Sequence, residues 1–329
     1  PELSILLAYS KMHLYQTLLE SELPDQDAAQ VFLKQYFPEK TRTRYAARIN
    51  DHPLRREIVA TMMTNRVVDQ AGCAFLNTLV RRAGATMVQG VAAYLVFDDV
   101  LGGAAIRSRL MAADNKMSAG RQHELLLALE TALAGLCRQV IEQGLPVSLD
   151  KGCVSRYRQR LKTFRTHLQE LLPDDEWQLC QAAADTLREE GLPAEMALEM
   201  SSLRYLAGFL PAVYIAEDTG ADLFSVTSAM AKMRLRLKMP LVMESLRDYS
   251  SHDKWDRMAV DNLQSAFIRQ TVNLTRLVVA GKTGAEAFLA EKRQRVNYYL
   301  DLLESLRSSP PTSTSPYMVL LRAMESIED

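Results

Sequence analysis

Apolar residues along this chain recur mostly at intervals of three and four, the spacing that places them on one face of an α-helix. The opening segment, up to Leu23-Pro24-Asp25, is the clearest case. Its predicted apolar stripe consists of Leu3, Ile5, Leu6, Leu7, Leu14, Leu18 and Leu19. A helix this apolar needs a packing partner from its first turn. We therefore expect the chain to be a segment of a longer polypeptide.

The rest of the chain follows the same helical spacing. Its 14 glycines and 12 prolines fall mostly between the periodic runs, as helix boundaries do. No sustained alternation and no Asn-Gly or Asp-Gly turn indicates a strand. The pattern predicts an all-α fold, and the lack of a fixed repeat length makes it an irregular multi-helical array. One long helix is predicted over residues 54–82.

Two neighbouring runs have a particularly regular spacing of three, four, three, four. Their apolar positions are Leu126, Leu129, Leu133, Leu136 and Val140, then Val154, Tyr157, Leu161, Phe164, Leu168 and Leu171. The turn residues Gly144-Leu145-Pro146 separate them. Such a pair predicts an antiparallel helical hairpin over residues 118–172, which we expect to project from the body of the protein.

These patterns suggest five parts along the chain. In order, they are an N-terminal helical bundle (1–117), the hairpin (118–172), a C-terminal helical bundle (173–307), a Ser/Thr/Pro linker (308–316) and a terminal amphipathic helix (317–329). The last helix is too short to be stable alone, so we expect it to dock on another part of the chain.

Composition narrows the choice of partners. With 39 basic and 40 acidic residues the formal charge is −1, which argues against binding to nucleic acid or to an anionic membrane by bulk charge. No apolar run reaches the roughly 18–20 residues that a membrane span needs, and no signal peptide is visible. The four cysteines are scattered, which favours reduced thiols and a cytoplasmic location.

Recognisable chemical motifs are few. The sequence has neither a Gly-x-Gly-x-x-Gly fingerprint nor a phosphate-binding loop, so no cofactor site is predicted in this segment. Asp98-Asp99 resembles the start of a magnesium-binding aspartate-rich helix, but Gly102 and Gly103 follow where a third carboxylate would be needed. A polar helix end is the simpler interpretation. The five histidines have no metal-ligand spacing, and no catalytic or metal residue is proposed.

A set of short segments, in a fixed order, carries more information than any one motif. They are the opening helix, the stretch from Pro38 through His52-Pro53-Leu54-Arg55-Arg56-Glu57 to Thr61, then Asn65, Val68, Gly72 and Phe75, Ala93-Tyr94-Leu95-Val96 after Gly84, Asp114-Asn115-Lys116, and Asp253-Lys254-Trp255. Together they make the chain similar to the large bacterial NAD-dependent glutamate dehydrogenases, in the part that follows the dinucleotide-binding domain. The similarity is dense to about residue 120 and thins afterwards. Asp69-Gln70 departs from the Asn-Arg-like pair expected there.

This resemblance implies the C-terminal helical domain of an enzyme that deaminates L-glutamate oxidatively to 2-oxoglutarate and ammonium with NAD. The catalytic and dinucleotide-binding domains would lie upstream in the same chain, and NAD would bind there. This segment would be non-catalytic, brace those domains and contribute to a homo-oligomer. The alternatives are an autonomous all-α interaction scaffold and, from Asp98-Asp99 alone, an all-α metal-dependent lyase or transferase.

The resemblance also suggests where the domains meet. The candidate inter-domain contacts are Arg55, Arg56, Asn65, Asp114, Asn115, Lys116 and Trp255. Each group has a simpler interpretation: an exposed ion-pair lattice for the arginines, a helix-capping turn for residues 114–116, and a core anchor for Trp255.

Overall fold

The computed structural model describes residues 2–113, 116–251, 253–309 and 311–328. Within these ranges every regular element is a helix, which confirms the all-α prediction. The helices form two compact units. One comprises residues 1–165 and 174–210, the other residues 166–173 and 211–329. This division does not follow the boundaries predicted at residues 117 and 172.

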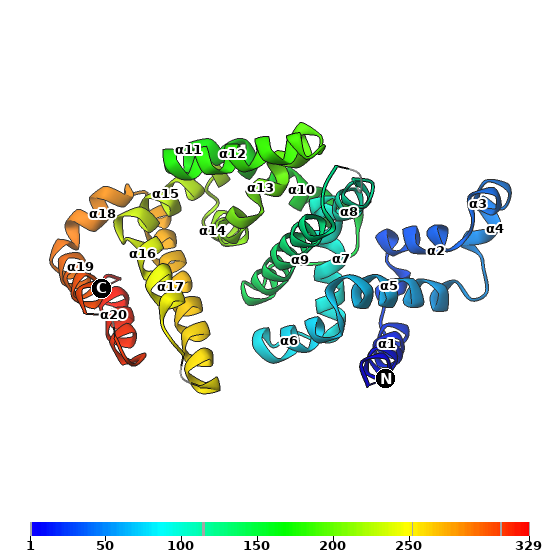
Figure 1. The fold of residues 1–329 in the computed structure, drawn as a ribbon, viewed down its shortest axis with the longest axis horizontal. Helices are drawn as coiled ribbons and strands as arrows, with labels where there is room; N and C mark the ends of the chain where they lie inside the picture. Colours follow the sequence, from blue (N-terminus) through cyan, green and yellow to red (C-terminus); the bar gives the residue numbers. More distant parts are fainter. Residues whose placement is uncertain (1, 114–115, 252, 310, 329) are drawn as a thin grey trace. The chain divides into compact units, whose positions relative to one another are not determined.

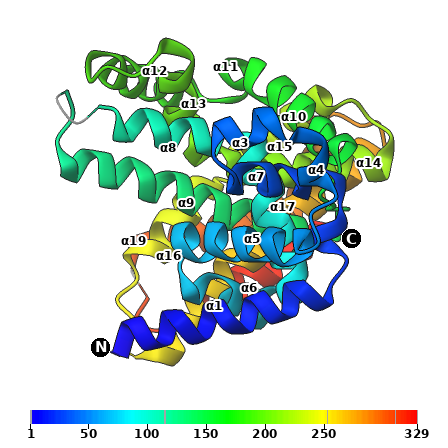
Figure 2. The same ribbon diagram turned by 90° about the vertical axis from the view of Figure 1, so that its right-hand side faces the viewer.

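The first unit contains most of the helices (Figures 1 and 2). They are α1 (Glu2–Glu20), η1 (Leu23–Asp25), η2 (Asp27–Ala29), α2 (Gln30–Tyr36), α3 (Glu39–Arg44), α4 (Ala46–Asn50), α5 (Arg55–Ala71), α6 (Cys73–Ala83), α7 (Met87–Leu101), α8 (Gly103–Met111), α9 (Ala119–Glu142), α10 (Lys151–Thr166), α12 (Asp174–Glu189), α13 (Ala194–Ser202) and η3 (Leu203–Gly208).

Helix α7 is the centre of the first unit. It begins with a capping box, in which the Thr86 hydroxyl accepts from the Gln89 backbone and the Gln89 side chain accepts from the Thr86 backbone. From Gly90 to Leu101 all of its residues except Asp99 are buried, because α5, α6, α8 and α9 surround it. Helix α1 lies along α5 and α6 on the outside of this group (Figure 2). The apolar run of α7, at residues 87–101, therefore forms the core helix of the first unit.

The long helix predicted over residues 54–82 is two helices. Gly72 has φ 83°, a left-handed conformation that a right-handed helix cannot contain, so α5 ends before it and α6 starts after it. The prediction failed because a continuous helix can also contain a single glycine. A glycine inside an apolar periodic run therefore does not by itself indicate a helix end.

The predicted helices of the hairpin exist, but α9 does not pair with α10 as an isolated arm. Its apolar face lies against α6, α7, α8 and η3, where Leu129, Leu133 and Val140 are fully buried. Helix α10 contacts α7 instead, with the rings of Tyr157 and Phe97 5.2 Å apart. Regular spacing predicted an apolar face correctly, but it does not determine which partner covers that face.

The second unit contains the remaining helices (Figure 1). They are α11 (Leu168–Leu171), α14 (Phe209–Thr219, whose first two residues belong to the first unit), α15 (Leu223–Arg236), α16 (Met239–Asp248), α17 (Lys254–Ala280), α18 (Ala285–Glu291), α19 (Arg293–Ser308) and α20 (Ser315–Glu325). Helix α20 packs on α17 and α19, and its Leu320 and Met324 are fully buried. The expectation that this short terminal helix docks is confirmed.

Among the described residues, no single helix is both long enough and apolar enough to cross a membrane. Only α7 and α8 taken together reach that length and composition, and the two helices are bent by 64° relative to each other.

Candidate functional site

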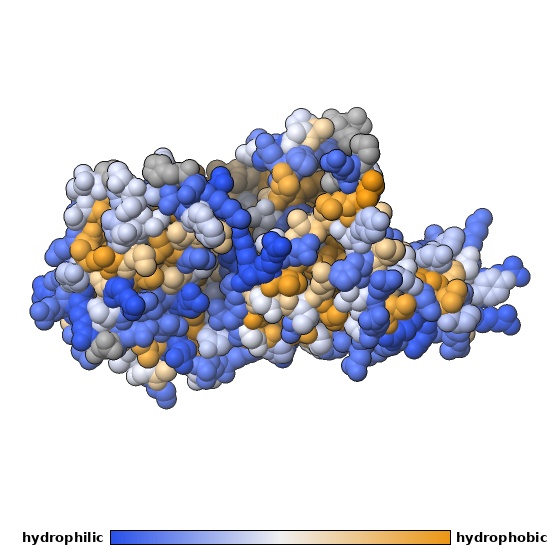
Figure 3. Space-filling view, turned by 90° about the horizontal axis from the view of Figure 1, so that it is seen from below, coloured by the Kyte–Doolittle hydropathy of each residue, from blue (hydrophilic) through white to orange (hydrophobic). Residues whose placement is uncertain are grey.

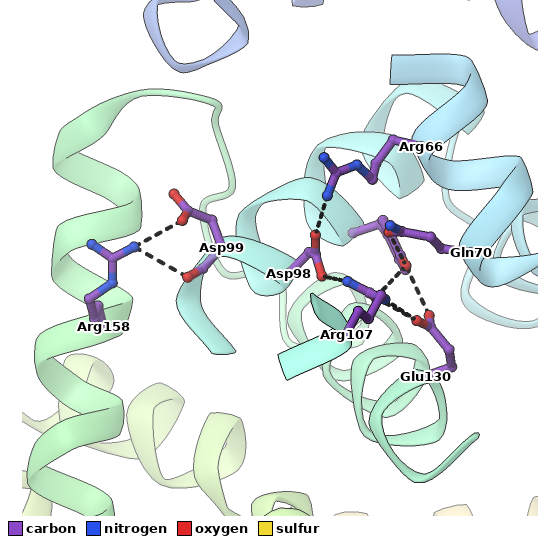
Figure 4. Close-up of polar contacts among 8 residues, drawn as sticks. Arg66, Gln70, Asp98, Asp99, Arg107, Glu130 and Arg158 are labelled. Atoms are coloured by element: carbon purple, nitrogen blue, oxygen red, sulfur yellow. Dashed lines mark hydrogen bonds and ion pairs between the residues drawn. The ribbon is translucent and has the colours of Figure 1, made fainter. Parts of the chain in front are cut away.

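A group of buried polar side chains interrupts the apolar core of the first unit. Tyr94 and Asp98 lie one turn apart on α7, so they project from the same face of that helix. Arg107 comes from α8 and Glu130 from α9. The left-handed conformation of Gly102 (φ 69°) ends α7, and α8 continues at an angle of 64° to it. At this bend Arg107 of α8 meets Asp98 of α7 (Figure 4).

Arg107 is the hub of this buried network. Its Nη1 donates to Asp98 Oδ1 at 2.5 Å, and its Nε and Nη2 donate to Glu130 Oε1 at 3.1 and 2.5 Å. Nη2 also donates to the Tyr94 hydroxyl at 3.1 Å. That hydroxyl donates in turn to Glu130 Oε2 at 2.9 Å. The guanidinium therefore joins three helices through charge-assisted hydrogen bonds.

Two residues of α5 complete the network. Arg66 Nη1 lies 3.5 Å from Asp98 Oδ2, and the side-chain oxygen of Gln70 lies 3.2 Å from the Tyr94 hydroxyl (Figure 4). Two arginines thus face two carboxylates, so the charges balance. The side chains of Arg107 and Asp98 are only 9% and 8% exposed. Buried charges are tolerated only when they are paired in this way.

Burial and neighbouring charges shift the pKa values of Tyr94 and Arg107, two members of the network. Burial raises the pKa of the Tyr94 hydroxyl well above its ordinary value, so this group stays neutral. For Arg107, burial opposes the charged form, but attraction to Asp98 and hydrogen bonds to Asp98 and Glu130 outweigh it and raise the pKa. Neither group can exchange a proton at neutral pH, which is the arrangement of a structural clamp and unlike that of an acid–base site.

Gly103 makes room for the network. A Cβ atom at this position would lie 2.0 Å from Asp98 Oδ1 and 2.8 Å from Arg107 Nη1. Side chains cannot approach so closely, so any other residue would push the ion pair apart. The Gly102-Gly103 pair, interpreted from the sequence only as a turn, therefore has two functions: one glycine bends the chain, and the other admits the Asp98–Arg107 pair.

Asp98 and Asp99 do not face one site. Asp98 points to Arg66 and Arg107, whereas Asp99 points to Arg158 of α10, whose Nη2 donates to Asp99 Oδ1 at 3.0 Å (Figure 4). In the part of the chain that the structure describes, no three His, Cys, Asp or Glu side chains gather closely enough to hold a metal ion. The arginines occupy the positions around these carboxylates that a cation would need.

An open cavity of about 540 Å³ adjoins the network within the first unit. Its polar wall includes Lys34, Arg66, Asp98, Asp99 and Lys151. This wall carries both cationic and anionic groups, so it has no single sign of charge that would select a ligand.

The sequence matches the family described as "Glutamate dehydrogenase, C-terminal" over residues 1–326. The chain belongs to this family. It is similar to three proteins named NAD-specific glutamate dehydrogenase. The protein of Halomonas elongata is 26% identical over 306 residues, which cover 93% of this chain and 19% of that protein. The protein of Mycobacterium tuberculosis is 28% identical over 267 residues (79% of this chain, 16% of that protein), and the protein of Pseudomonas aeruginosa is 24% identical over 334 residues (98% of this chain, 20% of that protein). The chain spans about a fifth of the length of these relatives.

The names of these relatives imply that the whole enzymes bind NAD. The question is whether the residues of this C-terminal segment could form a binding site for that dinucleotide. Dinucleotides are usually held where a strand meets a Gly-rich turn and a helix. The described residues contain no strand, and the sequence has no such Gly-rich fingerprint. The described residues therefore do not fit the usual dinucleotide site.

The predicted contact residues Arg55 and Arg56 begin α5 and hold the end of α1. Arg56 Nη2 donates to the backbone oxygens of Leu19 and Ser21 at 2.9 and 2.5 Å, and Arg56 also pairs with Asp25. Arg55 lies 3.3 Å from the same carboxylate. Their inter-domain role stays a prediction. Within this chain Arg56 fastens the end of α1 to α5, whereas Arg55 contacts Asp25 of η1.

Replacing Arg56 with alanine should loosen α1. The change leaves two helix-end carbonyls without a charged donor, which costs about 1–3 kcal/mol. We expect faster hydrogen exchange in residues 2–20, measured by mass spectrometry, with little change in α9. Arg55→Ala is the matched control, because this partly exposed arginine makes a single long contact. Equal exchange in both variants would contradict the assignment.

The other predicted contacts are scattered. Asn65 is half-buried on α5, and Lys116 is exposed with its chain against Gly191. Asp114 and Asn115 lie outside the described residues. Asn65 and Lys116 belong to the first unit and Trp255 to the second, and the inter-domain role of these residues stays a prediction.

Trp255 is 72% exposed at the start of α17, so the interpretation as a core anchor is wrong. The Asp253 side chain caps this helix by accepting from the backbone N–H groups of Trp255 and Asp256, at 2.7 and 2.9 Å. The cap fixes the helix start, but it leaves the indole ring outside the core. The sequence could not reveal this, because a cap determines where a helix starts without determining which side the core lies on.

Proposed function

We propose that this chain is the C-terminal helical part of an NAD-dependent glutamate dehydrogenase, and that it supports the catalytic domains without taking part in the chemistry. The whole enzyme deaminates L-glutamate oxidatively to 2-oxoglutarate and ammonium, and NAD accepts the hydride in a domain upstream. The chain's membership of the family and its share of the relatives' length support this proposal.

The observation that carries the non-catalytic role is the Arg107 network. Asp98 and Glu130 are both occupied by guanidinium groups, and the Tyr94 hydroxyl is held neutral between them. A catalytic carboxylate must be able to reach a substrate and exchange its proton. These carboxylates instead join α7, α8 and α9, which suits a domain whose function is to keep its shape.

The partners follow from the same proposal. The chain contacts the upstream catalytic and dinucleotide-binding domains of its own polypeptide, and the enzyme assembles as a homo-oligomer. It works in the cytoplasm. Support for this last point comes from the four cysteines, which are free thiols and include Cys137 and Cys180 deep in the first unit.

The test compares the full-length enzyme with the isolated 329-residue chain. We expect glutamate-dependent NAD reduction, followed by absorbance, from the full-length enzyme and none from the isolated chain. Circular dichroism must show that the isolated chain is helical, so that inactivity does not merely reflect unfolding. Activity in the folded chain alone would overturn the non-catalytic role, and a full-length protein inactive with glutamate would overturn the proposed reaction.

A further inference from the structure

Helix α1 is apolar on two opposite sides. Its inner side carries Leu14 and Leu18, which are almost fully buried against the rest of the first unit. Its outer side exposes four large apolar side chains by more than half of their surface: Ile5, Leu6, Tyr9 and Met12. We call these four residues the outer face of α1.

The outer face is a regular surface. Ile5, Tyr9 and Met12 follow the i, i+4, i+7 spacing of one helical stripe, and Leu6 lies beside them. Figure 3 views the molecule from the side on which α1 lies in Figure 1, and apolar patches reach the surface there among polar ones. A cluster of this kind, opposite the buried side of the same helix, is typical of a surface that another part of a protein covers.

The helix that carries this face is held firmly. Lys11 Nζ lies 2.6 Å from Asp69 of α5, and Arg56 holds the last turn of α1 through two backbone oxygens. Both fastenings leave the outer face uncovered. Since α1 cannot easily rotate to bury these side chains within the first unit, their partner must come from elsewhere.

The size of the face argues for a tethered partner. Four half-exposed side chains offer a few hundred Å², whereas a stable contact between separate proteins buries roughly 800 Å² on each partner. A partner on the same polypeptide needs less area, because tethering raises its local concentration to the millimolar range. A second copy of this chain would have to make a stable contact with this small face alone.

We propose that the outer face of α1 is the surface on which the domain immediately preceding Pro1 in the full-length polypeptide docks. This inference rests on the proposed function, in which the chain is the C-terminal part of a protein about five times as long. The polypeptide upstream of Pro1 enters through the first turn of α1, so it is tethered close to Ile5. It presents an apolar groove that receives Ile5, Tyr9 and Met12 as a helix-in-groove contact.

The test places a photo-cross-linker on this face in the full-length enzyme. Tyr9 is replaced with p-benzoylphenylalanine, the enzyme is irradiated, and cross-linked peptides are identified by mass spectrometry. We expect a product of single-subunit mass in which position 9 is joined to a peptide upstream of Pro1. Leu127 of α9, an apolar side chain of similar exposure, is the matched control position and should not reach that peptide.

Each other outcome would overturn the proposal. A product of twice the subunit mass would assign the face to a second copy, and cross-links only to residues 2–328 would mean that the domain covers its own helix. The absence of any cross-linked product at position 9 would mean that the face is open to solvent. Glutamate-dependent NAD reduction is assayed on the same samples, so a wrong docking surface on an active enzyme is distinguished from a wrong proposed function.

Discussion

Replacing Arg107 with methionine is expected to lower the free energy of unfolding of the 329-residue chain by about 3–5 kcal/mol. Methionine keeps much of the volume, but it removes the charge that compensates Asp98 and Glu130. Arg66, at 3.5 Å from Asp98 alone, cannot replace it. Urea unfolding followed by circular dichroism measures the change.

The matched control is Arg158→Met, the same substitution in an exposed ion pair. Arg158 and Asp99 have side chains 55% and 62% exposed, and pairs of this kind contribute about 1 kcal/mol or less. We expect the control to unfold at nearly the wild-type urea concentration. If both variants lost the same stability, the buried network would have no special role.

Replacing Gly103 with alanine is expected to destabilise the chain by about 2–4 kcal/mol. The new methyl group would overlap Asp98 Oδ1, so the carboxylate or the helix must move and the Asp98–Arg107 bonds lengthen. Alanine favours helix over glycine by about 1 kcal/mol. This gain is smaller than the loss, so the sign of the total effect is destabilising.

Gly135→Ala provides a control of opposite sign. Gly135 lies inside α9, and a Cβ atom there would meet nothing within 4 Å. Only the helix preference remains, so we expect a gain of about 0.5–1 kcal/mol. Thermal or urea unfolding of the two variants side by side checks the prediction. Stabilisation by both alanines would show that the network tolerates displacement.

The sequence was a good guide to where the helices lie, since helical periodicity is a local property. It predicted the opening helix, the terminal helix and the two runs of three-and-four spacing. It failed where one residue or one partner decides the outcome. Gly72 splits a predicted helix through its left-handed backbone, and the apolar face of α9 is covered by α7 and η3, which are distant in the sequence.

The sequence did not reveal the buried Arg107 network for a similar reason. Asp98 was visible as part of an acidic pair, but its partner Arg107 lies on the next helix and Glu130 on the one after. A single sequence does not indicate which arginine forms an ion pair with a given carboxylate. The Gly102-Gly103 pair between Asp98 and Arg107 was the available signal, because two adjacent glycines indicate both a turn and a close approach. Trp255 was misplaced because its environment, unlike its helix, depends on tertiary packing.

The first unit is discontinuous in the sequence, and this has a consequence during synthesis on the ribosome. The chain leaves this unit after residue 165, returns at residue 174 and leaves again after residue 210. Helix α9 is covered partly by η3, and the Gln139 side chain donates to the backbone oxygen of Ala207. A nascent chain that has only reached α10 therefore still exposes one side of α9. The first unit cannot complete its core until the chain has been synthesised to residue 210, well beyond the end of α10 at Thr166. Its folding therefore cannot finish before this later segment has been translated.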